Sequence, residues 1–152
     1  MEFVAIDFET TARDAFGDGG EPWQLGAALV RGGAIAETAE WFFGTPETPD
    51  FEPMMEQWES LHAFLAGRRL VAHNIACERT ILVRAAPLEN WGPWTDTLKL
   101  ARKRYPGLPS YALGELCSAL DCVPDLPGRT WHDGLFDAVA CANLALKLGI
   151  AP

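Results

Sequence analysis

The sequence predicts an α/β fold in which a mixed five-stranded sheet carries helices. Strand-type segments joined by a hairpin turn fill the first part of the chain, and short apolar strands then alternate with helix-type segments. This order is typical of a mixed sheet with helices packed against it. With 152 residues and 49% hydrophobic content, the chain matches one domain, 1–152, that has enough apolar material for a core.

Five segments have the composition and length of strands: Glu2 to Asp7, Trp23 to Arg31, Ala34 to Phe43, Leu70 to Ala72 and Trp94 to Asp96. Gly32 and Gly33 separate the second segment from the third and suit a tight hairpin turn. We therefore expect the first three strands to be antiparallel.

Five segments have helical character: Met54 to Leu65, Cys77 to Ala86, Thr97 to Arg104, Ser110 to Leu120 and Gly134 to Leu148. The first follows Pro53 and spaces its apolar residues at helical intervals, and Gly149 closes the last. The acidic, glycine-rich stretch from Arg13 to Glu21 is predicted to be a loop near the site.

Two carboxylates, Asp7 and Glu9, come at the end of the first strand. Side chains alternate across a strand, so both acids point to the same side and repel each other unless a cation lies between them. Mg²⁺ and Mn²⁺ prefer such carboxylate ligands. The alternative is that these are solvated acids at a strand end, and other segments must decide.

Two later segments add candidate site residues. Leu70 to Glu78 is predicted to be a buried strand, an Asn74 cap and the first turn of a helix, from which Glu78 reaches back toward the strand end. Further along, His132 falls in a loop and Asp137 in the helix that follows. One histidine can take a proton from water while carboxylates hold a metal, and this inventory suits phosphodiester hydrolysis.

These segments make the chain resemble the DEDDh 3'-5' exonucleases, a family that includes proofreading subunits of bacterial replicative polymerases and several ribonucleases. The three motifs are matched, in order, by Asp7-Phe8-Glu9-Thr10-Thr11, by Ala72-His73-Asn74 through Glu78, and by His132 with Asp137. Supporting similarity lies in Gln24-Leu25-Gly26-Ala27, Asp96 to Arg102 and Ser110 to Leu113. The resemblance spans nearly the whole chain and implies a ribonuclease-H-like fold.

The resemblance also implies a mechanism with two Mg²⁺ or Mn²⁺ ions. Asp7 would bridge the ions, Glu9 and Asp137 would complete one of them, and Glu78 would act through water. His132 would take a proton from the attacking water. The implied substrate is a single-stranded DNA or RNA 3' end, with DNA slightly favoured, and the candidate substrate contacts are Thr10, Asn74 and Trp131. A polymerase or another protein is a candidate partner.

The chain departs from the family pattern at two places. Glu78 stands where the family normally has Asp, so the carboxylate is kept on an arm one methylene longer. Pro46-Glu47 matches a family Pro-Glu, but no His-Gly-Ile-Thr segment follows before Pro53. Two rival functions stay open: a non-catalytic exonuclease-like module that binds nucleic acid or a polymerase, and a ribonuclease-H-type endonuclease. The position of His132, five residues before Asp137, favours the exonuclease.

The net charge of −9 argues against a protein that holds long nucleic acid by its own electrostatics. An exonuclease needs to grip only a few nucleotides at an end, and metal loading makes its acidic cluster locally cationic. The basic run Arg102-Lys103-Arg104 could touch phosphates or complement the dipole of its own helix, and Arg68-Arg69 invites the same two interpretations.

Several remaining residues receive structural interpretations. His73 is expected to make a structural hydrogen bond, Asp133 to cap the last helix, and Asp96 to end a strand. Among the aromatic residues, Trp41 and Trp58 are expected in the core, whereas Trp131 and Trp23 are candidates for nucleotide contact. Cys77, Cys117, Cys122 and Cys141 are expected to be small, reduced core residues. We see no leader-type or membrane-spanning run and expect a cytoplasmic protein without a membrane partner.

Overall fold

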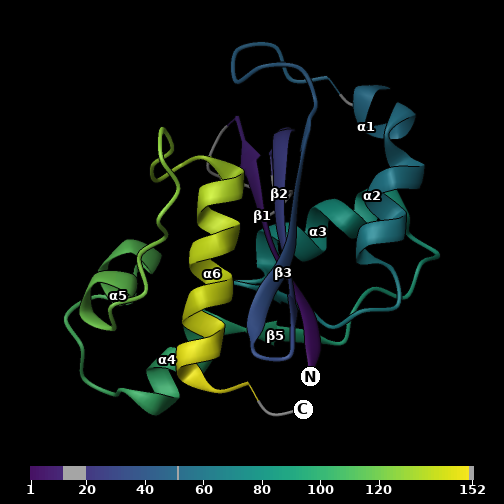
Figure 1. The fold of residues 1–152 in the computed structure, drawn as a ribbon. Helices are drawn as coiled ribbons and strands as arrows, with labels where there is room; N and C mark the ends of the chain where they lie inside the picture. The colour runs from purple at the N-terminus through teal and green to yellow at the C-terminus, as the bar shows by residue number, and fades with distance from the viewer. Residues whose placement is uncertain (12–19, 51, 151–152) are drawn as a thin grey trace.

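The computed structural model describes residues 1–11, 20–50 and 52–150 of the chain (Figure 1). Its sheet has the strand order β3-β2-β1-β4-β5. The pairs β1–β2 and β2–β3 are antiparallel, whereas β1–β4 and β4–β5 are parallel. The strands are β1 (Glu2–Thr10), β2 (Pro22–Arg31), β3 (Ala34–Phe42), β4 (Leu70–Ala72) and β5 (Trp94–Asp96). The predicted mixed five-stranded sheet is confirmed.

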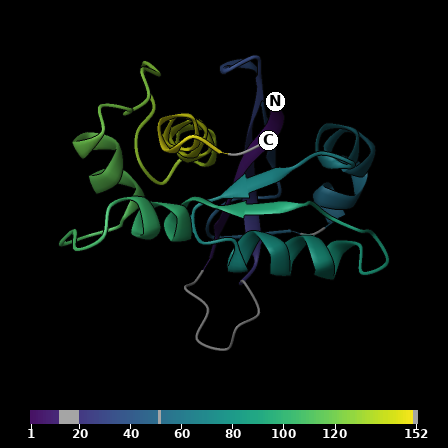
Figure 2. The ribbon, with the colours of Figure 1, turned by 90° about the horizontal axis from the view of Figure 1, so that it is seen from below.

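Helices cover both faces of this sheet. The long helix α6 lies against one face, with α1 and α2 beyond the other (Figure 1). Seen from below, α3 and α6 lie on opposite sides of β4 and β5 (Figure 2). The helices are α1 (Glu52–Glu56), α2 (Trp58–Leu65), α3 (Ala76–Ala85), α4 (Thr97–Arg104), α5 (Leu113–Ala119) and α6 (Gly134–Leu148).

The alternation of side chains along β1 decides which face the site occupies. Phe3 and Ala5 belong to the buried cluster that includes α6 residues, whereas Ile6 and Phe8 belong to the cluster on the α2 and α3 side. Asp7 continues the first series, so it faces the same side as α6. Phe8 is 5% exposed, which confirms that it points away from the two acids and into the core.

Most element bounds agree with the prediction to within a residue, but three differ. β1 continues to Thr10 because β2 pairs with it as far as Thr10 and Pro22, so Asp7 lies inside the strand. The single helix predicted from Met54 to Leu65 is wrong, since the chain leaves helical geometry at Gln57. The side-chain amide of Gln57 donates to the carbonyl oxygen of Pro53 at 2.8 Å, and α2 begins anew after it.

The third difference is at α5, which begins at Leu113 rather than Ser110. Ala112 is extended, with ψ 142°, and its N–H bonds to the side chain of Ser110 instead of continuing a helix. The Asn74 cap is also wrong, because Ile75 is the N-cap of α3 and makes no side-chain cap bond. Asn74 instead adopts φ +68° and donates its N–H to Asp96 Oδ1 at 3.0 Å.

Helix and turn ends otherwise follow the sequence signals. Gly32 and Gly33 both have positive φ, as a type I′ hairpin turn requires, and Gly149 ends α6 in the left-handed conformation. Asp133 caps α6 as predicted, accepting the N–H of Phe136 at 3.0 Å. In the loop predicted from Arg13 to Glu21, residues 13–19 lie outside the described part of the chain.

None of the four cysteines forms a disulfide, and all but Cys77 are buried, which agrees with their interpretation as small core residues. None of the helices in the described part of the chain combines the length and the apolar character that a membrane span requires.

Candidate active site

Three carboxylates from two elements meet where β1 passes the start of α6. Asp7 and Glu9 come from β1, and Asp137 comes from the first turn of α6. One ligand oxygen from each lies within 4.8 Å of the other two. Asp7 Oδ2 and Asp137 Oδ1 are shielded from solvent and have no hydrogen-bond partner among the described residues. Such orphaned acceptors are costly unless something positive satisfies them.

The pKa values of Asp7 and Asp137 also indicate that no positive group in the described part of the chain offsets the negative charge of the cluster. Burial raises the pKa of Asp7 well above its ordinary value, and the neighbouring charges of Glu78 and Glu9 raise it further. Burial, followed by the charge of Glu9, raises the pKa of Asp137 to about 7. The charge of Glu9 therefore opposes the ionisation of Asp7 and Asp137 in the absence of a cation.

Glu78 lies beside the cluster but belongs to a different local arrangement. Its side chain is buried, at 5% exposure, and its Oε1 accepts the backbone N–H of Phe8 at 3.3 Å. On this side of β1 the N–H of Val4 bonds to Arg69, next to β4. Since β4 ends at Ala72, it cannot serve Phe8, and the Glu78 carboxylate takes that place. Burial raises the pKa of Glu78 to about 7.

The donor set of the cluster fits a divalent cation. All three ligands are carboxylates, which Mg²⁺ and Mn²⁺ prefer. The unpartnered oxygens of Asp7 and Asp137 offer free lone pairs, and a cation would remove the repulsion that raises their pKa values. Glu78 stands outside this set of three, with one oxygen engaged by the β1 backbone.

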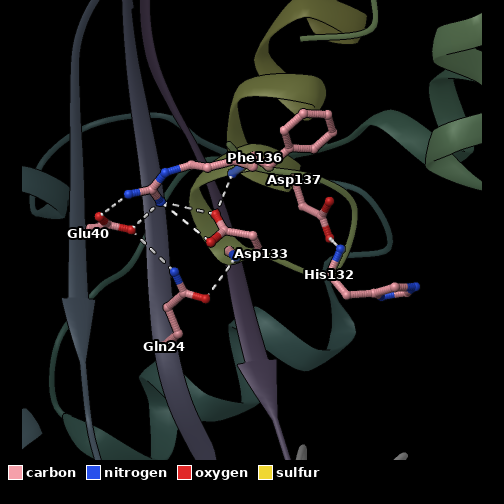
Figure 3. Close-up of polar contacts among 8 residues, drawn as sticks. Gln24, Glu40, His132, Asp133, Phe136 and Asp137 are labelled. Carbon is pink, nitrogen blue, oxygen red and sulfur yellow. Dashed lines mark hydrogen bonds and ion pairs between the residues drawn. The ribbon is translucent and has the colours of Figure 1, made fainter. Parts of the chain in front are cut away.

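His132 lies in the loop that enters α6 and is exposed. Its backbone N–H donates to Asp137 Oδ2 at 3.3 Å, and its imidazole points away from that carboxylate (Figure 3). The residue has φ +67°, a left-handed conformation that is strained for a side chain of this kind. Strain of this sort persists only where the surroundings hold it.

A hollow of about 310 Å³ adjoins the cluster. Trp131 forms part of its wall and packs edge-on against Phe136, with ring centroids 4.9 Å apart. Gly114 lies under the indole, since a Cβ there would be 3.4 Å from it. The lining residues are Ala112, Leu113, Gly114, Glu115, Trp131, His132 and Asp137.

The other candidate substrate contacts are not among the residues that line this hollow. Thr10 is half-buried and follows Glu9 at the end of β1. Asn74 is exposed and lies beside Asp96, at the ends of β4 and β5. Trp23 is half-buried in β2.

The structural interpretation of His73 is confirmed. Its Nε2 donates to the carbonyl oxygen of Tyr111 at 2.7 Å, and its Nδ1 lies 2.9 Å from Thr97 Oγ1. Burial lowers its pKa. Asp96 also has a structural role, because its side chain caps α4 by accepting the N–H of Leu98.

The aromatic and basic residues mostly have structural partners. Trp41 is buried, and Trp58 packs against the same core cluster. In the basic run, Arg104 donates to the carbonyl oxygen of Leu148 at 2.5 Å, and Arg102 stands over the ring of Tyr111. Arg68 donates to carbonyl oxygens at the end of α2, at Ala63 and Phe64.

Sequence reasoning assigned no role in the site to three polar residues that meet beside the start of α6. Arg129 forms an ion pair with Glu40, 89 residues earlier, and Glu40 also accepts from Gln24 (Figure 3). A separation of this size leaves no local signal for the pair. Gln24 had one, because it is a polar residue in an otherwise apolar strand segment.

Two curated relatives are PolC-type DNA polymerases III. The Bacillus cereus protein is 26% identical over 96% of this chain and 11% of its own length. The Mycoplasmopsis pulmonis protein is 29% identical over 88% of this chain and 11% of its own length. The chain therefore spans only about a tenth of the curated relatives it matches. No family model matches the chain.

Two solved structures share the fold. Exonuclease X in complex with 5' overhanging duplex DNA has a TM-score of 0.70 and 20% identity, covering 96% of this chain and 90% of its own. Escherichia coli exonuclease I in complex with a dA16 oligonucleotide has a TM-score of 0.61 and 15% identity, covering 96% and 40%. The ribonuclease-H-like fold and the resemblance to DEDD-type exonucleases are confirmed, while the histidine-bearing subclass stays a prediction.

Proposed function

We propose that the chain is a metal-dependent 3'-5' exonuclease that removes nucleotides from single-stranded ends, with DNA favoured over RNA. The observation that carries this proposal is the cluster of Asp7, Glu9 and Asp137, with its two unpartnered oxygens, next to the loop that bears His132. The fold neighbours in complex with DNA support a nucleic-acid substrate.

In this proposal Asp7, Glu9 and Asp137 hold Mg²⁺ or Mn²⁺. When bound, the cation supplies electrostatic stabilisation for the charge that develops on the attacking and leaving oxygens. Glu78 supports the site indirectly, because its hydrogen bond to the backbone N–H of Phe8 holds β1 in place between Asp7 and Glu9.

His132 is the proposed general base, taking a proton from the attacking water. Its exposed imidazole and its loop position allow the ring to turn toward the cluster when substrate is present. The backbone bond from His132 to Asp137 Oδ2 keeps the loop next to the carboxylates during that movement.

The hollow beside the cluster is the proposed place for the terminal nucleotide. Leu113 and Trp131 contribute apolar surface to its wall, and His132 and Asp137 complete the side nearest the acids. Aromatic and aliphatic walls suit unstacked bases without selecting sequence. The polymerase relatives favour a polymerase as protein partner in this proposal.

Product analysis tests the function directly. The protein is incubated with 5'-end-labelled single-stranded DNA and RNA of the same sequence, with Mn²⁺, with Mg²⁺ or with EDTA, and the products are separated by length. We expect a ladder that shortens one nucleotide at a time from the 3' end, faster on DNA, and no products in EDTA. The Asp7→Ala variant serves as the matched control for contaminating nucleases.

Other outcomes would identify the rival functions. Internal cuts from the earliest time points would indicate a ribonuclease-H-type endonuclease. Binding of the oligonucleotide without cleavage under every metal condition would indicate a non-catalytic module.

A further inference from the structure

A hydrogen-bonded network ties the loop before α6 to β2 and to the edge strand β3 (Figure 3). The guanidinium of Arg129 donates to both carboxylate oxygens of Glu40, each at 2.6 Å, and to Asp133 Oδ1 at 3.2 Å. Glu40 Oε2 also accepts from Gln24 Nε2 at 3.3 Å. The other end of that amide, Gln24 Oε1, accepts the backbone N–H of Gly134 at 2.9 Å.

The network encloses the segment that carries His132. Arg129 anchors the loop before the histidine, whereas Asp133 and Gly134 anchor the chain directly after it. The residues of β2 that receive the loop are also tightly packed. Gln24 is 1% exposed, and β2 lies so close to the loop at Gly26 that a Cβ there would be 2.0 Å from the carbonyl oxygen of Gly134. The loop therefore has both of its ends fixed against the sheet.

The bidentate pair provides geometry more than stability. The side chains of Arg129 and Glu40 are 32% and 23% exposed, and an ion pair in such surroundings returns little net folding free energy after desolvation. A planar guanidinium matched to both carboxylate oxygens nevertheless sets distance and angle together, which an ammonium group cannot do. The strained φ of His132 needs support of this kind.

We propose that Arg129 and Glu40 are positioning residues, which hold the loop of residues 130–133 so that His132 can take a proton from the attacking water beside Asp7, Glu9 and Asp137. This role rests on the exonuclease function proposed above. Neither side chain needs to touch substrate, since both act through the loop. The rival role is purely structural, in which the pair only stabilises the packing of β3 against the loop.

The variant Arg129→Lys separates the two roles, because it keeps the charge and loses the planar fork. We expect the kcat for single-stranded DNA to fall by roughly 10- to 100-fold, as small misplacements of a reacting group do, with KM changing less than about threefold. Mn²⁺ affinity, measured by titration calorimetry, should stay within about threefold, because the three carboxylates are not in the network. Glu40→Gln, which breaks the pair from the other side, should act in the same direction.

The matched control is Arg31→Lys. Arg31 pairs with Glu2 at the end of β2 opposite to Gln24, and the two side chains are 52% and 41% exposed. The same substitution there alters an ion pair at the other end of the strand from the loop contact. Its kcat should equal that of the parent. A lower thermal midpoint in Arg129→Lys with an unchanged kcat would assign the pair a structural role and overturn the proposal.

A double-mutant cycle tests whether the effect passes through His132. In a His132→Ala background, Arg129→Lys should lower kcat by less than about twofold, since the group that it positions is gone. A full 10- to 100-fold loss in that background would contradict positioning of His132.

A further measurement does not depend on nuclease activity. The His132 N–H is bonded to Asp137 Oδ2, so its hydrogen exchange reports how firmly the loop is held. Arg129→Lys should speed this exchange by about tenfold or more, and Arg31→Lys should leave it unchanged. Unchanged exchange in Arg129→Lys would overturn the positioning role, whereas faster exchange in a protein without nuclease activity would refute only the proposed function.

Discussion

Two polar groups lie on either side of the start of α6, and they are built in opposite ways. In the network of Gln24, Glu40, Arg129 and Asp133, each carboxylate has a hydrogen-bond donor, and the charges alternate in sign. In the cluster of Asp7, Glu9 and Asp137, all charges are negative, and two shielded oxygens have no partner among the described residues. Protein groups therefore satisfy the hydrogen-bonding groups of the network but, among the described residues, not all of those of the cluster.

This difference indicates what each group is for. A satisfied network specifies a geometry and changes little when ligands arrive. A cluster of repelling, desolvated acids costs folding free energy, which the rest of the fold must supply, and such sites are where binding function concentrates. The two groups are adjacent, so His132, the proposed base, lies between the hydrogen-bonded network and the proposed cation site.

The largest effect should come from removing a cluster acid. Asp7→Ala or Asp137→Ala should lower hydrolysis by more than about 10⁴-fold, because the proposed cation site, which would supply most of the rate enhancement, is lost. Thermal unfolding should show an equal or higher midpoint, since a repelling charge has gone. Activity lost through global unfolding, or metal-dependent cleavage that persists, would refute the role of these acids.

Removing the proposed base should have the next largest effect. His132→Ala should lower kcat by roughly 10²- to 10⁴-fold, the usual range for a general base, while metal affinity is kept. Single-turnover cleavage of end-labelled DNA measures the rate, and Mn²⁺ titration calorimetry measures the affinity. A variant as fast as the parent would exclude His132 from the reaction.

The raised pKa values of the buried acids also predict an unusual pH dependence of stability. The folded-state pKa values of Asp7, Glu78 and Asp137 are raised, so the metal-free folded protein binds protons more tightly than the unfolded chain does. Stability from these groups is therefore present at about pH 4 and is lost as pH rises through about 7. We expect the thermal midpoint in EDTA to fall by about 5 °C between pH 5 and pH 8.

Millimolar Mg²⁺ or Mn²⁺ should reverse most of that loss at pH 8 and have little effect at pH 5, because protonated carboxylates do not bind the ion. A midpoint that is independent of both pH and metal would mean that the acids are not coupled as described. Asp7→Ala provides the control, since its pH dependence should be shallower than that of the parent.

The smallest predicted effect separates charge from length at Glu78. Glu78→Gln keeps an acceptor for the Phe8 N–H and removes a buried charge, so its thermal midpoint at pH 8 should rise by about 3 °C. Its activity should fall well below that of the parent. Glu78→Asp keeps the charge and should stay within about tenfold of the parent rate, a barrier change of about 1.4 kcal/mol. A Gln variant as active as the parent would show that this charge is dispensable.

The sequence by itself determined the series of strands, most of the helices, the shared side of Asp7 and Glu9, and the cap at Asp133. These follow from short-range rules: alternation along a strand, apolar spacing along a helix, and side-chain bonds within one turn. The acidic residues of the site could be named in advance for the same reason, since each lies in a local motif. The extent of the chain as one domain and the chemical roles of these acids stay predictions.

The tertiary structure alone decided how those acids are completed. Glu78 bonds to Phe8 because β4 ends too soon to serve that N–H, and no local pattern records where a neighbouring strand stops. The Gln57 side-chain amide donates to the carbonyl oxygen of Phe42, 15 positions earlier in β3, and Arg129 meets Glu40 across 89 positions. Each of these contacts joins segments that meet only when helices and loops pack against the sheet, so their energies arise from packing and not from the sequence around any one residue.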